Sequence, residues 1–347
     1  MTDILKLSAY FAERERAGAA FLADTLLDLY ATGGVATSIA LRGIASFGPH
    51  RIVRTDQSLS LSENLPITVI ATDTAERIRA VADDAVGLIG RGLVTLERAR
   101  LQPAADGAVR LSVYLGRQQR LGGRPADLAT TALLHRLGFA AAVVHLGVDG
   151  TVDGRRRRAK FFSRNADVPV LVLGIGTAEQ AAAAVAALQG LRVTAERATI
   201  CKRAGQLLAP PPSLPSADGG GLGLFQKLTV FTEEDARHGG RPIHRALVQR
   251  LIEGGQASGA TVQRGIWGFT GPGDPHGDRM FALGRRVPVT TVLIDTPDVI
   301  AHSFEIVDEL TAEQGLVTCE SIPAMVALDG ADRYGGTTLA RHPFQAG

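Results

Sequence analysis

The chain has 347 residues, of which 45% are hydrophobic, so it is long enough to bury more than one core. Its 37 Lys and Arg against 35 Asp and Glu give a net charge of +2, which is too balanced for nucleic acid to be an expected partner. Two cysteines without metal-binding spacing, and an N-terminus without a signal-peptide pattern, predict a cytoplasmic location.

Residues 1–103 predict a unit with the element order β-α-β-β-α-β. Leu5 to Phe11 alternates apolar and polar residues, as a strand does. A helix with Leu22 and Leu26 on one stripe follows and ends at Gly33-Gly34. The remaining elements are strands at 36–41, 67–71 and 92–97 and a helix that begins near 73–76. This order is that of the ferredoxin-like fold.

The same order returns twice along the chain. A second, divergent unit covers 106–204 and a third covers 224–327, joined by a Pro/Gly-rich linker at 205–223. The tail at 328–347 has no periodicity and is predicted to be loose. The predicted fold class is therefore α+β, with three tandem ferredoxin-like domains.

The third strand of each unit predicts how the units pack. Val170 to Leu173 is apolar at every position, which indicates a strand covered on both faces. Helices cover only one face of such a unit, so three units could cover each other's open faces. Tandem fusion then replaces a symmetric oligomer, and the prediction is a monomer that forms an intramolecular pseudo-trimer.

The most distinctive motif stands at the end of the second strand, as Arg42-Gly43-Ile44-Ala45-Ser46-Phe47-Gly48 and again as Arg264-Gly265-Ile266-Trp267-Gly268-Phe269. An arginine at a strand end beside glycine can present a charge-assisted fork to a phosphate. Alternatively, the glycines turn the chain and the arginine pairs with a carboxylate. Because the middle unit has Leu146-Gly147 there, the three clefts are expected to be unequal. The candidate ligand-binding residues from this motif are Arg42, Gly43, Phe47, Gly48, Arg264, Gly265 and Phe269.

Gly-Gly-Arg-Pro precedes the first helix of the second and third units, at 122–125 and 239–242. The sequence predicts the proline in the first helical turn, where its missing N–H costs nothing. An arginine beside a helix N-terminus favours anions, which adds Arg124 and Arg241 as candidate ligand-binding residues. The alternative is a purely structural helix start.

Catalytic and metal-binding patterns are weak. No Ser-His-Asp or Cys-His arrangement and no repeated pair of carboxylates stands out, so no enzyme activity is predicted. Asp274, His276 and Asp278 offer too few ligands for a metal site. The run Arg155 to Arg158 is interpreted as a solvated loop face or as a contact for an acidic partner or anion.

Together, the Lys-Leu-Ser-Ala-Tyr-Phe phrase, Gly-Gly-Arg-Pro, the Arg-Gly-Ile motif, the proline-led third strand and the Gly-Leu-Val-Thr strand resemble the PII-like family of uncharacterised conserved bacterial proteins. That family is related in fold to the nitrogen-regulatory PII and CutA trimers. The resemblance implies a regulatory protein that binds a small anionic ligand, most plausibly an adenine nucleotide, in the clefts between units.

The resemblance also implies signalling through the long loops at 45–58, 149–164 and 267–286. Their expected target is a regulatory partner protein, for which a membrane transporter is the class considered. Two alternatives remain open on sequence alone: a ferredoxin-like enzyme with its active site in the same clefts, and a purely structural adaptor.

Overall fold

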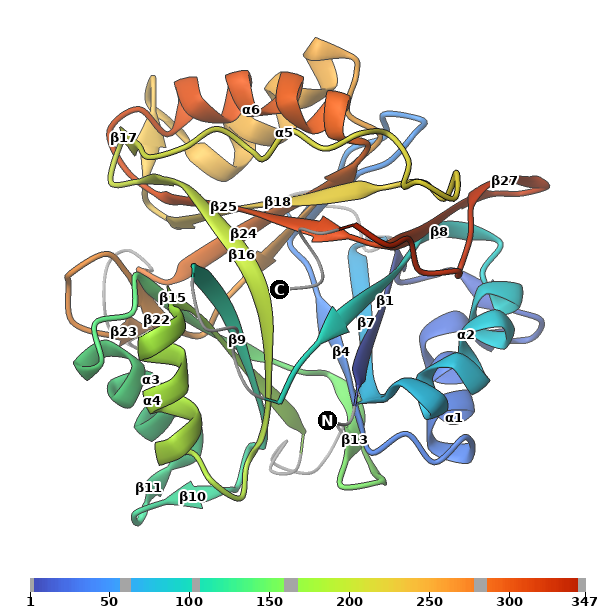
Figure 1. The fold of residues 1–347 in the computed structure, drawn as a ribbon, viewed down its shortest axis with the longest axis horizontal. Coiled ribbons are helices and arrows are strands. Elements are labelled where there is room, and N and C mark those ends of the chain that lie inside the picture. The colour runs from blue at the N-terminus through green and yellow to red at the C-terminus, as the bar shows by residue number, and fades with distance from the viewer. Residues whose placement is uncertain (1–2, 57–63, 102–106, 159–167, 278–285, 343–347) are drawn as a thin grey trace.

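The computed structural model describes residues 3–56, 64–101, 107–158, 168–277 and 286–342. Each unit has two helices on one side of its sheet, and Figure 1 shows the three helix pairs at the outside with the strands toward the centre. The α+β class predicted from the sequence is confirmed. The described helices are α1 Leu22–Thr32, α2 Ala75–Leu88, α3 Ala126–Arg136, α4 Ala178–Ala187, α5 Ile243–Gly254 and α6 Pro297–Leu310. Each of these six described helices is too short or too polar to cross a membrane.

Four antiparallel strands form the sheet of each unit, and all three units share one strand order. In chain numbering the orders are β4-β7-β1-β8, β12-β15-β9-β16 and β21-β24-β18-β25. The strands of the first unit are β1 Ile4–Ala12, β4 Thr37–Arg42, β7 Pro66–Thr74 and β8 Arg91–Ala99. Those of the second are β9 Ala108–Gly116, β12 Ala141–Leu146, β15 Pro169–Thr177 and β16 Arg192–Arg203. Those of the third are β18 Phe225–Glu233, β21 Ala260–Arg264, β24 Pro288–Asp295 and β25 Leu316–Ile322.

Local sequence accounts for the helix starts. The Thr74 hydroxyl accepts a hydrogen bond from the backbone N–H of Arg77, as the capped start near residue 74 predicts. Thr177 and Gln180 form a reciprocal capping box at the start of α4. Each cap satisfies backbone donors that the first helical turn leaves unpaired.

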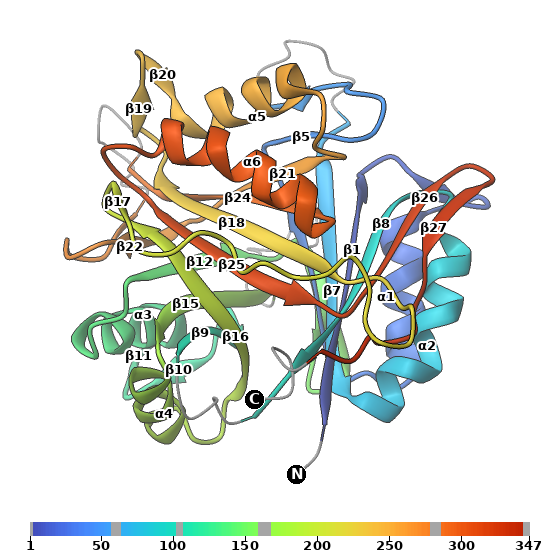
Figure 2. The same ribbon diagram turned by 45° about the horizontal axis from the view of Figure 1, so that its top comes forward.

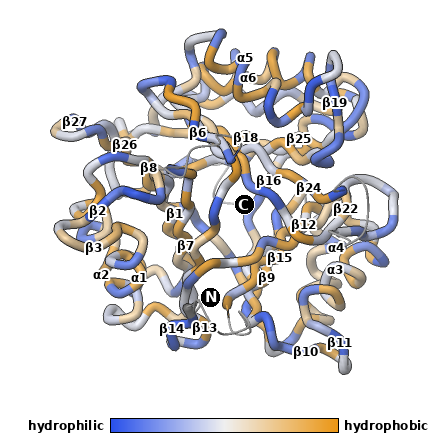
Figure 3. Tube along the Cα trace, turned by 180° about the vertical axis from the view of Figure 1, so that it is seen from behind, coloured by the Kyte–Doolittle hydropathy of each residue, from blue (hydrophilic) through white to orange (hydrophobic). Residues whose placement is uncertain are grey.

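Both faces of the central strands are covered, as the apolar third strands predict. Every residue of β24 is buried, and so is every residue of β15 except Thr177 at its end. Figure 3 shows hydrophobic residues along these central strands. One face of each sheet packs on the unit's own helices and the other packs on neighbouring units, so both faces are shielded from solvent.

The loops after the second strands are partly strands, which the sequence analysis did not predict. β5 (Ala45–Phe47) leaves the first unit and pairs with β21 of the third. β13 (Asp149–Val152) pairs likewise with β4, and β22 (Trp267–Thr270) with β12. Each unit therefore adds a strand to the preceding unit's sheet in a closed cycle. The expected loop tips at 57–58, 159–164 and 278–285 lie outside the described residues.

The cluster Arg155 to Arg158 is likewise part of this exchange. These residues form β14, which pairs with β13. The Arg156 guanidinium bridges Asp149 of its own unit and Asp24 and Asp28 on α1 of the first unit. Arg156 thus docks the hairpin on its neighbour, and the interpretation as a wholly solvated face is wrong for this residue.

The C-terminal tail is ordered over most of its length, contrary to the prediction that it is loose. β26 (Ala324–Asp329) pairs with β8 of the first unit, and β27 (Asp332–Gly335) returns along β26. Further on, the Ala340 carbonyl accepts a hydrogen bond from Arg98, and Thr337 donates to Asp83. Figure 2 shows β26 and β27 continuing the first unit's sheet. The tail was misread because strand pairing with a segment more than 200 residues away leaves no local periodicity.

Candidate ligand-binding cleft

The candidate site is a cavity of about 440 Å³ between the first unit, the third unit and the C-terminal hairpin β26–β27. The first unit contributes the end of β1, the start of β8 and the segment from Ser46 to Arg54. The third contributes Ser258 to Thr261 and the end of β24. Its volume lies within the range of about 300–1,000 Å³ typical of small-molecule sites.

Charged groups from three parts of the chain meet at this cavity. Asp329 of the hairpin accepts from Arg91 Nε at 2.8 Å and lies 2.8 Å from His50 Nε2. The Arg91 guanidinium and the His50 imidazole together lower the pKa of the Asp329 carboxyl. Arg54 and Arg333 also line the cavity, and neither forms an ion pair with another described residue. The walls between these groups are largely apolar, with Phe47, Ile52, Met325 and Leu328 among their side chains.

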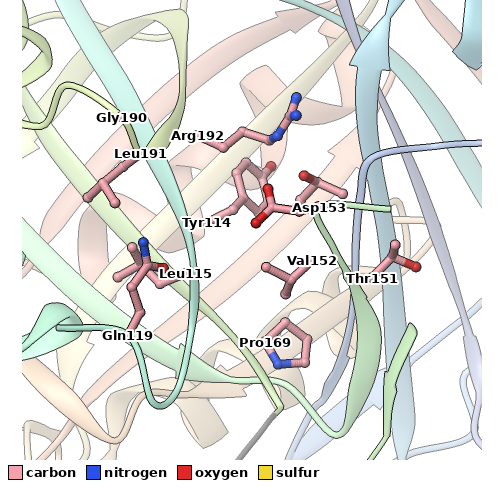
Figure 4. A pocket seen from close by; sticks show the side chains of 11 residues that line it. Tyr114, Leu115, Gln119, Thr151, Val152, Asp153, Pro169, Gly190, Leu191 and Arg192 are labelled. Atoms are coloured by element: carbon pink, nitrogen blue, oxygen red, sulfur yellow. The ribbon is translucent and has the colours of Figure 1, made fainter. Parts of the chain in front are cut away.

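The equivalent cleft between the second and first units has almost closed. It holds about 40 Å³, and Figure 4 shows Tyr114, Asp153 and Arg192 around it. Tyr114 stands where the first unit has Tyr10, and Pro169 stands where it has Pro66. The same framework therefore surrounds both clefts, but the smaller one has room for little more than water.

At the third junction, apolar side chains occupy the equivalent positions. Ala140 and Ile175 of the second unit pack with Phe231 and Leu316 of the third in one buried cluster. The clefts of about 440 Å³ and 40 Å³ are thus unequal, in agreement with the divergence of the middle sequence.

The two motif arginines are held by carboxylates. Arg42 Nε donates to Glu13 at 2.9 Å, and Arg264 Nη2 donates to Glu234 at 2.6 Å and to Asp56 at 3.2 Å. Glu13 and Glu234 occupy the same repeat position, one residue beyond the equivalent first strands. The middle unit has Arg117 and Leu146 at the two positions, so both members of the pair changed. Neither Arg42 nor Arg264 lines the 440 Å³ cavity.

The motif glycines permit the chain to cross between units. A Cβ on Gly43 would lie 2.7 Å from the Val262 carbonyl oxygen, and one on Gly265 would lie 2.6 Å from Val143 Cγ1. Both contacts are shorter than a carbon side chain tolerates, so the crossings require glycine.

The motif phenylalanines insert into the neighbouring units. Phe47 packs in the core of the third unit, and Phe269 packs in the core of the second, edge-on to His135 at 5.0 Å. Of the nine candidate ligand residues, Phe47 and Gly48 line the large cavity.

Gly-Gly-Arg-Pro forms a small hairpin before the helix. Gly122 and Gly123 have φ of 57° and 80°, and Gly239 and Gly240 have φ of 55° and 82°, values that suit a tight turn. Pro125 and Pro242 directly precede α3 and α5, so the predicted place of the proline in the first turn is wrong by one residue. Arg124 and Arg241 are exposed on these hairpins, and neither lines the large cavity.

At the centre of the molecule lies a buried charge cluster to which each unit contributes one cation and one carboxylate. Its side chains come from paired first and fourth strands, and the residues are between 2% and 9% exposed. The members of this central charge cluster are Lys6, Glu97, Arg110, Glu196, Lys227 and Glu320.

Ion pairs in this cluster cross the unit boundaries. Lys6 Nζ lies 3.0 Å from Glu97 and 3.3 Å from Glu196, and Lys227 Nζ lies 2.5 Å from Glu97 and 2.8 Å from Glu320. Arg110 Nη1 donates to Glu320 at 2.9 Å. Burial alone would raise the pKa of Glu97, but the Lys227 and Lys6 ammonium groups hold that pKa well below its usual range. Burial opposes the charge of Lys6 in the same way, and the Glu196 and Glu97 carboxylates raise its pKa.

The sequence carried a signal for this cluster that was missed. Each fourth strand contains a glutamate at the same repeat position, and each first strand has a lysine or arginine in the alternating run. The search for repeated pairs of carboxylates did not find it, because each unit contributes a single glutamate. Lys6 lies on the face of the sheet that other units cover, and its side chain is therefore buried despite the alternating pattern of its strand.

The comparisons with known proteins agree with the repeats. The model of DUF190, described as "Uncharacterized ACR, COG1993", matches residues 4–101, 108–200 and 225–324. The chain belongs to this family. The match confirms the resemblance to uncharacterised PII-like proteins that the motifs indicate. A "UPF0166 protein" from Aquifex aeolicus (strain VF5) is 32% identical over 96 residues, which cover 27% of this chain and 88% of that protein. The region that this relative matches thus corresponds to about one unit of the present chain.

Proposed function

We propose that this DUF190 chain forms an intramolecular pseudo-trimer, in which three ferredoxin-like units are arranged around a pseudo-threefold axis. The shared strand order, the cyclic exchange of β5, β13 and β22, and the central charge cluster support this arrangement. A relative about one unit long also supports it, because fusion of three such units would give the present length.

The pseudo-trimer predicts a monomer in solution. Size-exclusion chromatography with light scattering is expected to give a mass near 36.5 kDa, because the interfaces that would join separate subunits are already satisfied within one chain. A stable assembly of three chains would contradict this arrangement.

We further propose that the protein is a cytoplasmic, non-enzymatic regulator that binds an adenine nucleotide between units. The observation that carries this proposal is the 440 Å³ cavity, whose apolar walls suit a planar base and whose cations suit phosphate. Arg54, Arg91 and Arg333 could each give a phosphate charge-assisted hydrogen bonds. The segment from Ser46 to Arg54 lines the cavity, so a ligand there would alter the loop that presents the signal to a target protein such as a transporter.

A thermal-shift screen with ATP, ADP, AMP, cyclic nucleotides and simple anions tests this function. An adenine nucleotide at 100 times its Kd is expected to stabilise the protein by about 2.7 kcal/mol. Arg54→Ala is expected to weaken the binding about tenfold, because a charged hydrogen bond to phosphate is lost. The matched control is Arg250→Ala, which removes an exposed ion pair with Glu309, and neither residue lines the cavity.

Two results would contradict the proposed function. A folded protein that no nucleotide stabilises would exclude the sensor, and turnover of a bound nucleotide would favour the enzyme alternative instead.

A further inference from the structure

The fold departs from its own repeat at the C-terminal hairpin. Each fourth strand continues into the next unit's fourth strand: Arg100 bridges to Ala195, the end of β16 pairs with β25, and β26 pairs with β8. After β16 the chain returns as the two-residue β17 (Gln206–Leu207), turning at Ala204-Gly205. The third continuation extends further before it turns.

The extra length of β26–β27 consists of two residue pairs, Leu328 with Arg333 and Asp329 with Asp332. All four of these residues line the large cavity. Tyr334, opposite Ala327, lines it too, with 58% of its surface exposed and its ring edge-on to Phe225 at 6.1 Å. The two extra pairs therefore add to the wall of the cavity four residues for which β16–β17 has no counterpart.

The ion pairs of Asp329 fix this wall to the first unit. Arg91 at the start of β8 and His50 in the segment after β5 both bind its carboxylate. The wall and the segment from Ser46 to Arg54 thus meet at one side chain. At the junction of the second and first units the equivalent space is about 40 Å³, and at the junction of the third and second units Phe231 and Leu316 belong to a buried apolar cluster.

We infer that the chain holds one ligand, at the cleft between the first and third units, and that the β26–β27 hairpin determines the specificity of this site. Arg333 supplies a cation to the phosphate of the ligand and Tyr334 supplies an aromatic face to its base. This inference rests on the proposed nucleotide binding and adds to it the number of sites and the residues that select the ligand.

Titration calorimetry and native mass spectrometry with the stabilising adenine nucleotide test the inference. One molecule per chain is expected. Arg333→Ala and Tyr334→Ala are expected to weaken binding about tenfold each while leaving the fold intact, because both side chains are exposed. Arg155→Ala, an exposed arginine on β14, is the matched control with unchanged binding.

Filling each cleft separately gives a second measurement. Ala327→Trp places a large ring in the large cavity and is expected to weaken binding by about 100-fold or more. Val152→Trp in the small cleft is expected to leave the affinity and the stoichiometry unchanged. Circular dichroism of both variants establishes that they fold.

The outcomes separate the two proposals. Two or three molecules per chain, or wild-type affinity in Arg333→Ala and Ala327→Trp, would overturn the single hairpin-built site and leave nucleotide binding standing. Absence of nucleotide binding to the wild-type protein would overturn both.

Discussion

Replacing Glu97 by alanine is expected to lower the free energy of unfolding by about 3–5 kcal/mol. The Glu97 carboxylate forms ion pairs with two ammonium groups, those of Lys6 at 3.0 Å and Lys227 at 2.5 Å. Glu97 is 3% exposed. Removing the carboxylate leaves both cations buried with less compensation and leaves a cavity beside them. Because Lys227 belongs to the third unit, the loss also loosens the contact between the first and last units.

Urea denaturation followed by circular dichroism measures this loss as a fall in the midpoint. The matched control is Arg250→Ala, which breaks an exposed ion pair with Glu309 and is expected to cost less than about 1 kcal/mol. A Glu97→Ala variant as stable as that control would mean that the central charge cluster does not hold the units together.

The lowered pKa of Glu97 also predicts how the stability of the protein depends on pH. The folded-state pKa of Glu97 lies below the ordinary value, so its stabilisation is fully present above about pH 4.5 and is lost as the pH falls toward the folded-state pKa. The Glu97→Ala variant lacks this contribution at every pH. Its stability is therefore expected to fall less steeply below pH 4.5 than that of the wild-type protein.

Sequence periodicity predicted the elements within each unit because their determinants are local. The alternation from Leu5 to Phe11 matches β1, and the stripe of Leu22 and Leu26 is buried on α1. Thr74 caps α2 at the predicted place. These features depend on residues close together in the chain, so a repeat of the pattern was sufficient to find all three units.

Pairing between units was not predictable in the same way. β5 pairs with β21 and β26 pairs with β8 across more than 200 residues. The sequence pattern of β5 or β26 does not indicate which strand it pairs with. The candidate site was the least predictable feature, because part of its wall comes from a tail without sequence periodicity. Phe47 and Gly48 were identified through the motif, whereas Arg333 and Tyr334 lie in the tail, outside every repeated motif.

Replacing Gly268 by alanine is expected to detach β22 from β12 and to lower the free energy of unfolding by at least about 1–3 kcal/mol. Gly268 has φ +153°, a conformation that L side chains rarely adopt. Its added Cβ would lie 2.1 Å from the Ala142 carbonyl oxygen, so the backbone must move. Since β22 carries the buried Phe269 into the second unit's core, the shift also removes apolar packing there.

Gly273→Ala is the matched control in the same segment, because an added Cβ there meets nothing within 4 Å. Hydrogen exchange reports the detachment directly. The backbone N–H groups of β12 that face β22 are expected to lose protection in Gly268→Ala and to keep it in Gly273→Ala. Equal protection in both variants would mean that the exchanged strand contributes little to holding the third unit against the second. Loss of protection confined to this edge would instead show that each exchanged strand secures its own junction, because β5 and β13 lie at the other two.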